Sequence, residues 1–186
     1  MNQQPARANR RRQDGALLIE VLVAMLLMSF GMLSLGVMLS FSVQMTRLSS
    51  YRSSAINLAA SHIGRIRANP GGMQYYQQPL HETAWSFDEI DSDTCSYPSC
   101  TTQSLAIMDD AATRRAVRLQ LPAGDVLMTC DTGVCGPNAY GNLWVVWQEP
   151  TTAGTIDLST ADHCPALVTN LYTDPRPRCF YVRFQI

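Results

Sequence analysis

The chain has 186 residues, a formal net charge of −1 and an apolar fraction of 46%. This length fits one modest domain with a terminal extension. The near-neutral charge and the apolar content argue against a nucleic-acid-binding protein and against a disordered chain.

Residues 1–15 form a basic leader, in which Asp14 is the only acid and the arginines are Arg7, Arg10, Arg11 and Arg12. Residues 16–43 follow as an apolar run, and about 20 such residues suffice to span a bilayer as a helix. Basic residues before the span predict a cytoplasmic N-terminus and an exported C-terminal part. The run is too long for a cleaved secretory signal. A plain anchor would explain the arginines and the run, but not Glu20, because a charge within a membrane segment costs free energy.

The stretch GALLIEVLVAM, residues 15–25, resembles the class III signal of type IV pilins and pseudopilins. The resemblance implies that prepilin peptidase cuts after Gly15 and methylates the new N-terminal amine of Ala16, which makes Glu20 the fifth mature residue. The family usually has phenylalanine at the first mature position, so Ala16 is a departure. The resemblance also implies that Glu20 engages an N-terminal amine in the filament, which is physically reasonable because opposite charges attract strongly in a low dielectric. The amine can belong to the same or to a neighbouring subunit.

A long helix over residues 16–69 is predicted. Beyond the membrane part, residues 16–43, an amphipathic stripe continues with Leu48, Ala55, Ala59, Ile63 and Ile66. The stretch NPGG at residues 69–72 is a strong stop signal. The second half of the helix is expected to pack on an exported domain, residues 70–186.

Two further stretches resemble PilV-type minor pilins. RIRANPGG at residues 65–72 is similar to the end of their long helix. LPAGDVLMTC at residues 121–130, followed by LWVVWQEP at residues 143–150, is similar to a later region.

The exported domain is expected to begin with a long loop over residues 73–102. Ser104 can cap a helix over residues 105–119. One apolar face of this helix is predicted to carry Leu105, Met108, Ala112, Ala116 and Leu119. The early acids and late arginines of this helix suit its dipole: Asp109, Asp110, Arg114, Arg115 and Arg118.

Strands follow at residues 125–130 and 143–148, which predict a hairpin, and at residues 179–186. The last strand is expected to place Phe180, Val182 and Phe184 on one face. Trp144 and Trp147 are three residues apart on one strand, so they should face opposite sides, one in the core and one at an interface. The pattern predicts an α+β fold with a small antiparallel sheet, and the resemblance implies that this is the type IV pilin fold.

All six cysteines follow the apolar run, which fits an oxidising compartment. Fifteen connectivities are possible, and disulfides between nearest neighbours are favoured. A zinc site is disfavoured because no CxxC is present. The expected pairs are Cys95–Cys100, Cys130–Cys135 and Cys164–Cys179.

The sequence carries none of the metalloprotease, serine-hydrolase or P-loop motifs. His62 lies on the long helix, whereas His81 and His163 lie in polar segments. The acidic run DEIDSD, residues 88–93, lacks the glycine and the distant glutamate of an EF-hand, so it is interpreted as a solvated loop. No metal, cofactor or enzymatic activity is expected.

The resemblance implies a minor pilin that is held in the bacterial inner membrane with a periplasmic domain and then enters an extracellular pilus. Its implied partners are prepilin peptidase, other minor and major pilins, the inner-membrane assembly platform and a tip adhesin. Twitching motility and adhesion would be the processes served. The alternatives are a pseudopilin of type II secretion and, in another class, a membrane-anchored periplasmic enzyme or binding protein.

Overall fold

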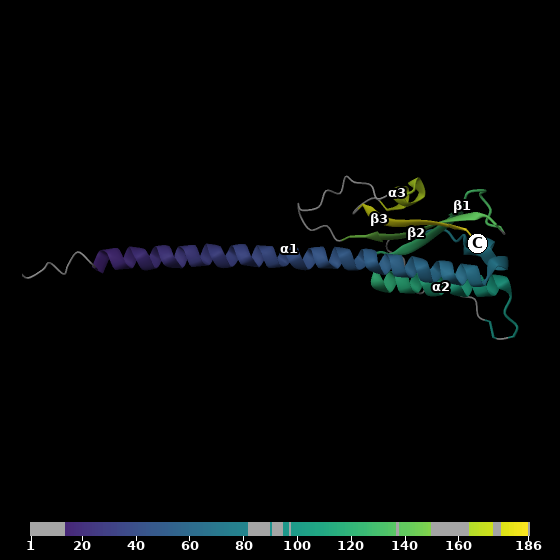
Figure 1. The fold of residues 1–186 in the computed structure, drawn as a ribbon, viewed down its shortest axis with the longest axis horizontal. Coiled ribbons are helices and arrows are strands. Elements are labelled where there is room, and N and C mark those ends of the chain that lie inside the picture. Colours follow the sequence, from purple (N-terminus) through teal and green to yellow (C-terminus); the bar gives the residue numbers. More distant parts are fainter. Residues whose placement is uncertain are drawn as a thin grey trace, which may run out of the picture. The chain divides into compact units, whose positions relative to one another are not determined.

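The computed structural model describes residues 14–81, 90, 95–96, 98–136, 138–149, 164–172 and 176–185, with side chains from residue 17 onward. The chain divides into two compact units, Met1–Arg47 and Leu48–Ile186. The fold is α+β and of the type IV pilin kind, with a long helix, a small sheet and extra helices (Figure 1). It also contains disulfides.

The first element, α1, is a 55-residue helix from Asp14 to Ala68. It ends where expected, because Pro70 and two glycines follow it. A 3₁₀ helix, η2 (Pro70–Tyr76), comes next, so the loop expected from residue 73 begins later. The difference arises because Met73 and Tyr76 are almost fully buried in the core, and their packing holds this turn in place.

The C-terminal half of α1 packs through one face, as the stripe predicted. Ala55, Ala59, Ile63 and Ile66 are buried there. Two further residues, Leu58 and His62, are buried on the same face but were not included in the predicted stripe.

The helix α2 runs from Thr102 to Gln120. Its N-cap is Thr101, whose hydroxyl oxygen accepts the backbone N–H of Ser104, so the expected cap at Ser104 was wrong by three residues. The expected apolar face was also wrong, since Leu105 and Leu119 are exposed. The buried side of α2 is mixed and consists of Ala106, Asp110, Ala111, Thr113, Arg114 and Val117.

Three antiparallel strands form the sheet in the order β1-β2-β3: β1 (Asp125–Cys130), β2 (Tyr140–Gln148) and β3 (Pro177–Gln185). The predicted hairpin and terminal strand are confirmed. Leu127, Trp144 and Tyr181 stand in one cross-strand row.

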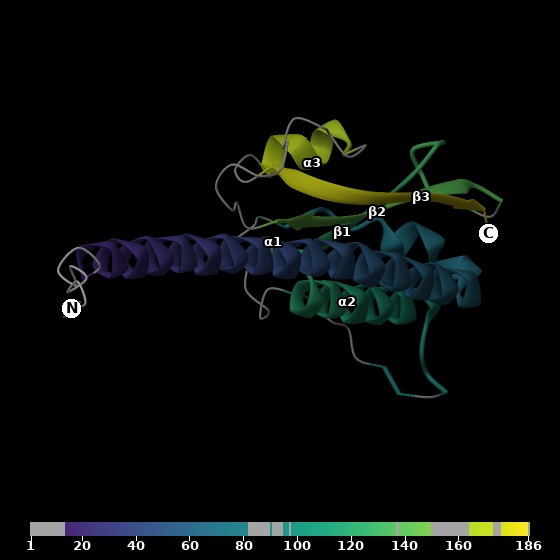
Figure 2. The same cartoon turned by 60° about the vertical axis from the view of Figure 1, so that its left-hand side comes forward.

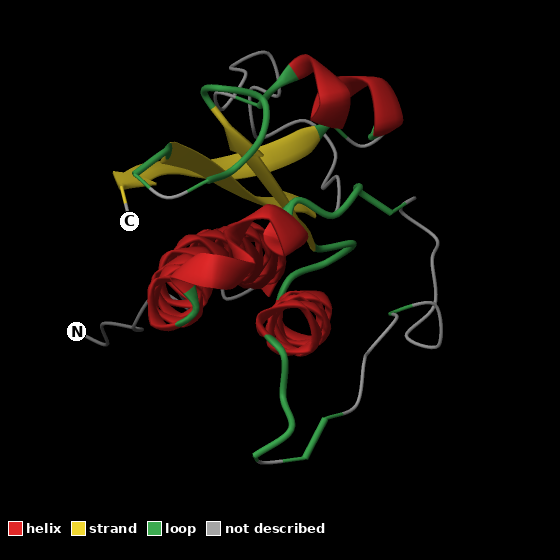
Figure 3. Cartoon of the chain, turned by 90° about the vertical axis from the view of Figure 1, so that its right-hand side faces the viewer, coloured by secondary structure: helices red, strands yellow, loops and turns green. Residues whose placement is uncertain are grey.

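The sheet separates two apolar clusters. On one face, α1 and α2 cover residues such as Val126, Leu143 and Trp147 (Figure 3). On the other face lies α3 (Ala166–Leu171), a short helix that was not expected from its proline-rich surroundings (Figure 2). Val168 and Tyr172 anchor it to the sheet. Full burial of each large apolar side chain stabilises the fold by roughly 1.5–3 kcal/mol.

Candidate assembly segment and buried polar cluster

The predicted processing site lies at the start of α1. Gly15 and Ala16 are in its first turn, and Glu20 follows as an exposed side chain one turn later. The arginines of the leader lie outside the described residues. Glu20 thus lies on the helical turn that follows the predicted cleavage bond.

The apolar part of α1 is exposed in the isolated chain. One helix of the described residues is long and apolar enough to cross a membrane, with a mean hydropathy of 2.3. Within it, every large apolar side chain from Leu17 to Leu39 is more than half exposed. A surface of this size marks contact with lipid or protein. The segment fits membrane anchoring and, in a pilin, contact with other subunits.

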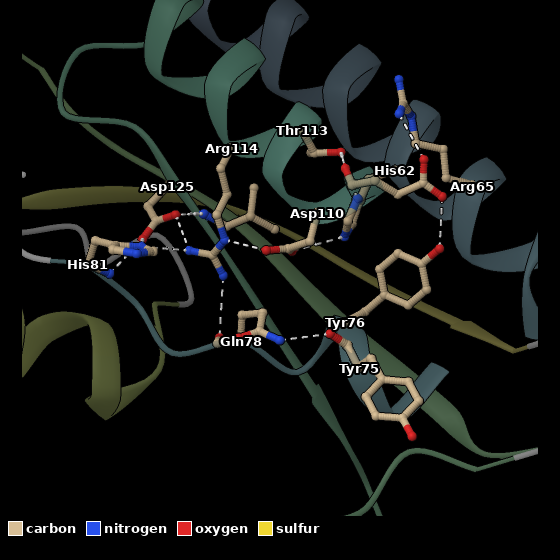
Figure 4. A network of polar contacts seen from close by, with 12 residues as sticks. His62, Arg65, Tyr75, Tyr76, Gln78, His81, Asp110, Thr113, Arg114 and Asp125 are labelled. Atoms are coloured by element: carbon tan, nitrogen blue, oxygen red, sulfur yellow. Dashed lines mark hydrogen bonds and ion pairs between the residues drawn. The ribbon is translucent and has the colours of Figure 1, made fainter. Parts of the chain in front are cut away.

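The exported unit contains a buried polar cluster centred on Arg114 of α2 (Figure 4). Its Nε donates to Asp110 Oδ2 at 2.6 Å, and its Nη1 donates to Asp125 Oδ1 at 2.5 Å. The same guanidinium reaches His81 Nδ1 at 3.0 Å and the Gln78 carbonyl at 3.4 Å. One arginine thus joins α2, strand β1 and the segment after η2.

Asp125 is held from several sides. Its two carboxylate oxygens accept the backbone N–H groups of Val126 and His81, each at 2.7 Å, besides the guanidinium of Arg114. The side chain is completely buried. A buried carboxylate with these donors fixes the start of β1 against α2.

His62 links α1 to the cluster. Its Nδ1 lies 2.9 Å from Thr113 Oγ1, and its Nε2 lies 4.0 Å from Asp110 Oδ1. Burial, reinforced by the charges of Arg114 and Arg65, lowers the pKa of His62 to about 3. The imidazole is therefore neutral in the folded protein at physiological pH.

The two charged partners on α2 respond differently to burial. Burial raises the pKa of Asp110, although Arg114 opposes that shift. Burial also disfavours the charge on Arg114, but the carboxylates of Asp110 and Asp125 outweigh it and raise the pKa of the guanidinium. Arg114 is the fixed charge of the cluster.

A second branch lies nearer the surface. Arg65 of α1 donates to Asp109 Oδ1 at 3.0 Å, and the Tyr76 hydroxyl donates to Asp109 Oδ2 at 3.0 Å. Burial raises the pKa of Tyr76, so its hydroxyl stays protonated and donates this bond. Asp109 thus connects α1, η2 and α2.

The sequence pattern did not predict this cluster. It assigned Asp110 and Arg114 only to a charge arrangement that suits the helix dipole, whereas both are almost fully buried. It placed His81 in a polar loop, and the structure brings that residue to Arg114. The available signal was the four-residue spacing of Asp110 and Arg114 on the side of α2 that also carries Val117.

The disulfides lie away from this cluster. The structure joins Cys95 to Cys100, Cys130 to Cys135 and Cys164 to Cys179, which is the neighbour pairing that the sequence favoured. The last of these bonds ties the segment before α3 to strand β3.

The two tryptophans of β2 face opposite sides, as predicted. Trp147 is buried under α1 and α2, and its indole N–H donates to Glu149. Trp144 stacks on Tyr181 on the other face, with ring centroids 5.1 Å apart.

No metal centre emerges from the described part of the chain. No group of three or more His, Cys, Asp or Glu side chains there is arranged to hold an ion. His163 and the acids of the DEIDSD run lie outside the described residues.

Residues 39–111 match the family model Tt1218-like, described as type IV pilin Tt1218. The matched stretch includes the second half of α1, η2 and the first half of α2. No match was found among curated proteins or solved structures. The family match supports a type IV pilin, and type IV pilins are structural, non-enzymatic subunits that assemble with other pilins into a filament.

Proposed function

We propose that this chain is a PilV-type minor pilin of a type IV pilus. Prepilin peptidase cuts it after Gly15 and methylates Ala16, and residues 16–43 hold it in the inner membrane until assembly. The observation that carries the proposal is the order of features along the chain. A basic leader, a glycine, four apolar residues and Glu20 open an apolar, exposed helix that continues into a disulfide-bonded domain.

The exposed apolar surface gives the physical reason for assembly. Lipid covers this surface before assembly, and the helices of neighbouring subunits replace lipid in a filament. Glu20 alone would be costly in either setting. Cleavage creates the ammonium group of Ala16, which offsets that cost by ion pairing.

The assignment to the PilV type rests on the RIRANPGG stretch and on the resemblance of residues 121–130 and 143–150 to PilV-type pilins. On this proposal the chain joins other minor pilins in a priming complex at the pilus tip, built by the inner-membrane assembly platform. The complex presents a tip adhesin and supports twitching motility and adhesion.

Mass spectrometry of the mature protein tests the proposal directly. We expect a chain that begins at methylated Ala16 and that is recovered in sheared pili. An intact leader would exclude the pilin assignment and would favour an anchored periplasmic protein. A processed chain that is missing from pili, in cells that have them, would favour a type II secretion pseudopilin.

A substitution separates the role of Glu20 from cleavage. We expect Glu20→Ala to be cleaved normally but to enter pili poorly, because the amine of Ala16 loses its partner. Ser29→Ala is the control, since it removes a polar group of the same segment that bonds only locally, to the Met25 carbonyl at 2.7 Å. Normal incorporation of Glu20→Ala would contradict the ion-pair role.

A further inference from the structure

His62 and Asp110 present two buried polar atoms to each other without a hydrogen bond. His62 Nε2 and Asp110 Oδ1 are 4.0 Å apart, and neither has a hydrogen-bond partner among the described residues. Both side chains are at least nine-tenths buried. Buried polar atoms in native proteins nearly always have a partner, so this pair calls for an explanation.

The contacts of Thr113 indicate where the protons of His62 lie. Thr113 Oγ1 is 2.8 Å from the Asp109 carbonyl oxygen and 2.9 Å from His62 Nδ1. A carbonyl oxygen only accepts, so a hydroxyl that donates to it accepts in turn from Nδ1–H. Nε2 of a neutral His62 then carries a lone pair that faces the carboxyl oxygen of Asp110.

The balance of buried charges in the cluster favours a proton on Asp110. Three charged side chains of the cluster are at least nine-tenths buried, and they comprise one cation, Arg114, and two acids, Asp110 and Asp125. A net negative charge in a buried site is unfavourable unless a proton or another cation compensates it. Protonation of Asp110 leaves Arg114 and Asp125 as a matched pair.

The other groups around the pair do not supply that charge. Arg65 is partly exposed and is already paired with Asp109. His81 places its Nδ1 3.0 Å from Arg114 and 3.4 Å from Asp125 Oδ2, so it lies on the Arg114–Asp125 side of the cluster. The remaining neighbour, Tyr76, packs its ring edge-on against His62 at 5.6 Å and donates its hydroxyl to Asp109.

We propose that Asp110 and His62 form a buried proton-binding site, in which Asp110 is protonated in the folded protein and directs its O–H at His62 Nε2. This hydrogen bond requires His62 Nε2 and Asp110 Oδ1 to approach from 4.0 Å to about 3 Å. The site lies between α1 and α2, so its proton stabilises their contact. This inference does not depend on the proposed role in a pilus.

The site predicts an unusual dependence of stability on pH. The ordinary pKa values of 6.5 for His62 and 3.8 for Asp110 describe the unfolded chain. Between about pH 4 and pH 6.5, the folded pair holds one proton on Asp110 and the unfolded pair holds one on His62, so stability is level. Above about pH 6.5 the unfolded pair has lost its proton while the folded pair keeps one. Stability then falls as the pH rises.

The variant Asp110→Asn tests this with the full chain in detergent micelles. Its amide NH₂ replaces the O–H toward His62 but does not titrate. The measured quantity is the ratio of two unfolding equilibrium constants, that of the unmodified chain divided by that of the variant. For Asp110→Asn, this ratio should rise by up to about tenfold per pH unit between about pH 5 and pH 7. A ratio that stays constant over this range would overturn the proposal. Asp109→Asn is the matched control, and its ratio should stay constant because Arg65 already compensates Asp109.

A second measurement does not use Asp110→Asn. Long-range ¹H–¹⁵N correlation spectra of the unmodified chain report the tautomer of each histidine, and His62→Gln assigns the signal of His62. We expect the Nδ1–H tautomer at neutral pH. An Nε2–H tautomer would mean that Thr113 donates to Nδ1 and that His62 donates to an ionised Asp110, which would refute the proton site.

Discussion

Replacement of Arg114 by methionine should destabilise the exported unit strongly. Methionine keeps an unbranched apolar side chain in the same space but removes all donors of the guanidinium. Asp125 then stays buried without its 2.5 Å partner, and the Gln78 carbonyl loses its 3.4 Å contact. The perturbation therefore acts through an uncompensated charge rather than through a large cavity.

The magnitude follows from the burial of both partners. Removal of one member of a buried ion pair costs about 3–5 kcal/mol. Arg114 and Asp125 have side-chain exposures of 2% and 0%, so little of this cost is relieved by solvent. At roughly 3 °C per kcal/mol for a domain of this size, the Tm should fall by about 10–15 °C.

Thermal unfolding of the full chain in detergent, followed by near-ultraviolet circular dichroism, measures the effect. The control is Arg183→Met, because Arg183 and its partner Asp131 are both exposed, and exposed ion pairs contribute little. A double variant, Arg114→Met with Asp125→Asn, should regain part of the lost stability, since Asp125 is then no longer a buried charge without its partner. An Arg114→Met protein as stable as the control, or no recovery in the double variant, would refute the reasoning.

Two further predictions concern the ends of helices. Gly72→Ala should destabilise the fold by about 1–3 kcal/mol, because a Cβ there would lie 2.6 Å from the backbone oxygen of Thr102. Gly71→Ala is the control, since a Cβ at Gly71 would make only an ordinary contact with the Thr102 side chain. Equal Tm values for the two variants would contradict the prediction. Thr101→Ala should cost about 1 kcal/mol through loss of the N-cap of α2. Urea titrations of the two variants measure this cost, and Ser104→Ala should lose less stability than Thr101→Ala. A larger loss for Ser104→Ala would mean that Ser104 is the cap.

The elements that the sequence predicted well are those with local signals. The apolar run and the amphipathic stripe need only the neighbouring residues to indicate a helix, and NPGG ends it wherever it packs. The strands of the hairpin and the C-terminal strand likewise carry their own β-branched and aromatic residues. The pairing of β1 with β2 follows from the short connection between them, whereas β2 and β3 pair across a long segment that contains α3.

The elements that it missed depend on distant partners. The helix α3 has six residues, too few to be stable alone, and it exists because Val168 packs on the sheet and Cys164 is bonded to Cys179. The cap of α2 was missed because Thr101 and Ser104 are both good caps, and only the packing of the helix selects between them.

The buried cluster was missed for a deeper reason. A hydrophobic pattern ranks Leu105 and Leu119 above Asp110 and Arg114 as core residues, and the structure reverses that order. The reversal requires Asp125, which lies eleven residues beyond Arg114 on another element. Polar burial is favourable only when the whole set of partners is present, so it cannot be read from one helix.

This cluster also has a structural consequence for how α1 meets α2. Both helices contribute buried apolar side chains to the same core, such as Ile63 and Ile66 of α1 and Val117 of α2. Hydrogen bonds of His62 with Thr113 and of Arg65 with Asp109 occur at one register only. We infer that the polar contacts select the register while the apolar contacts supply most of the stability, because hydrogen bonds depend on direction and apolar burial does not.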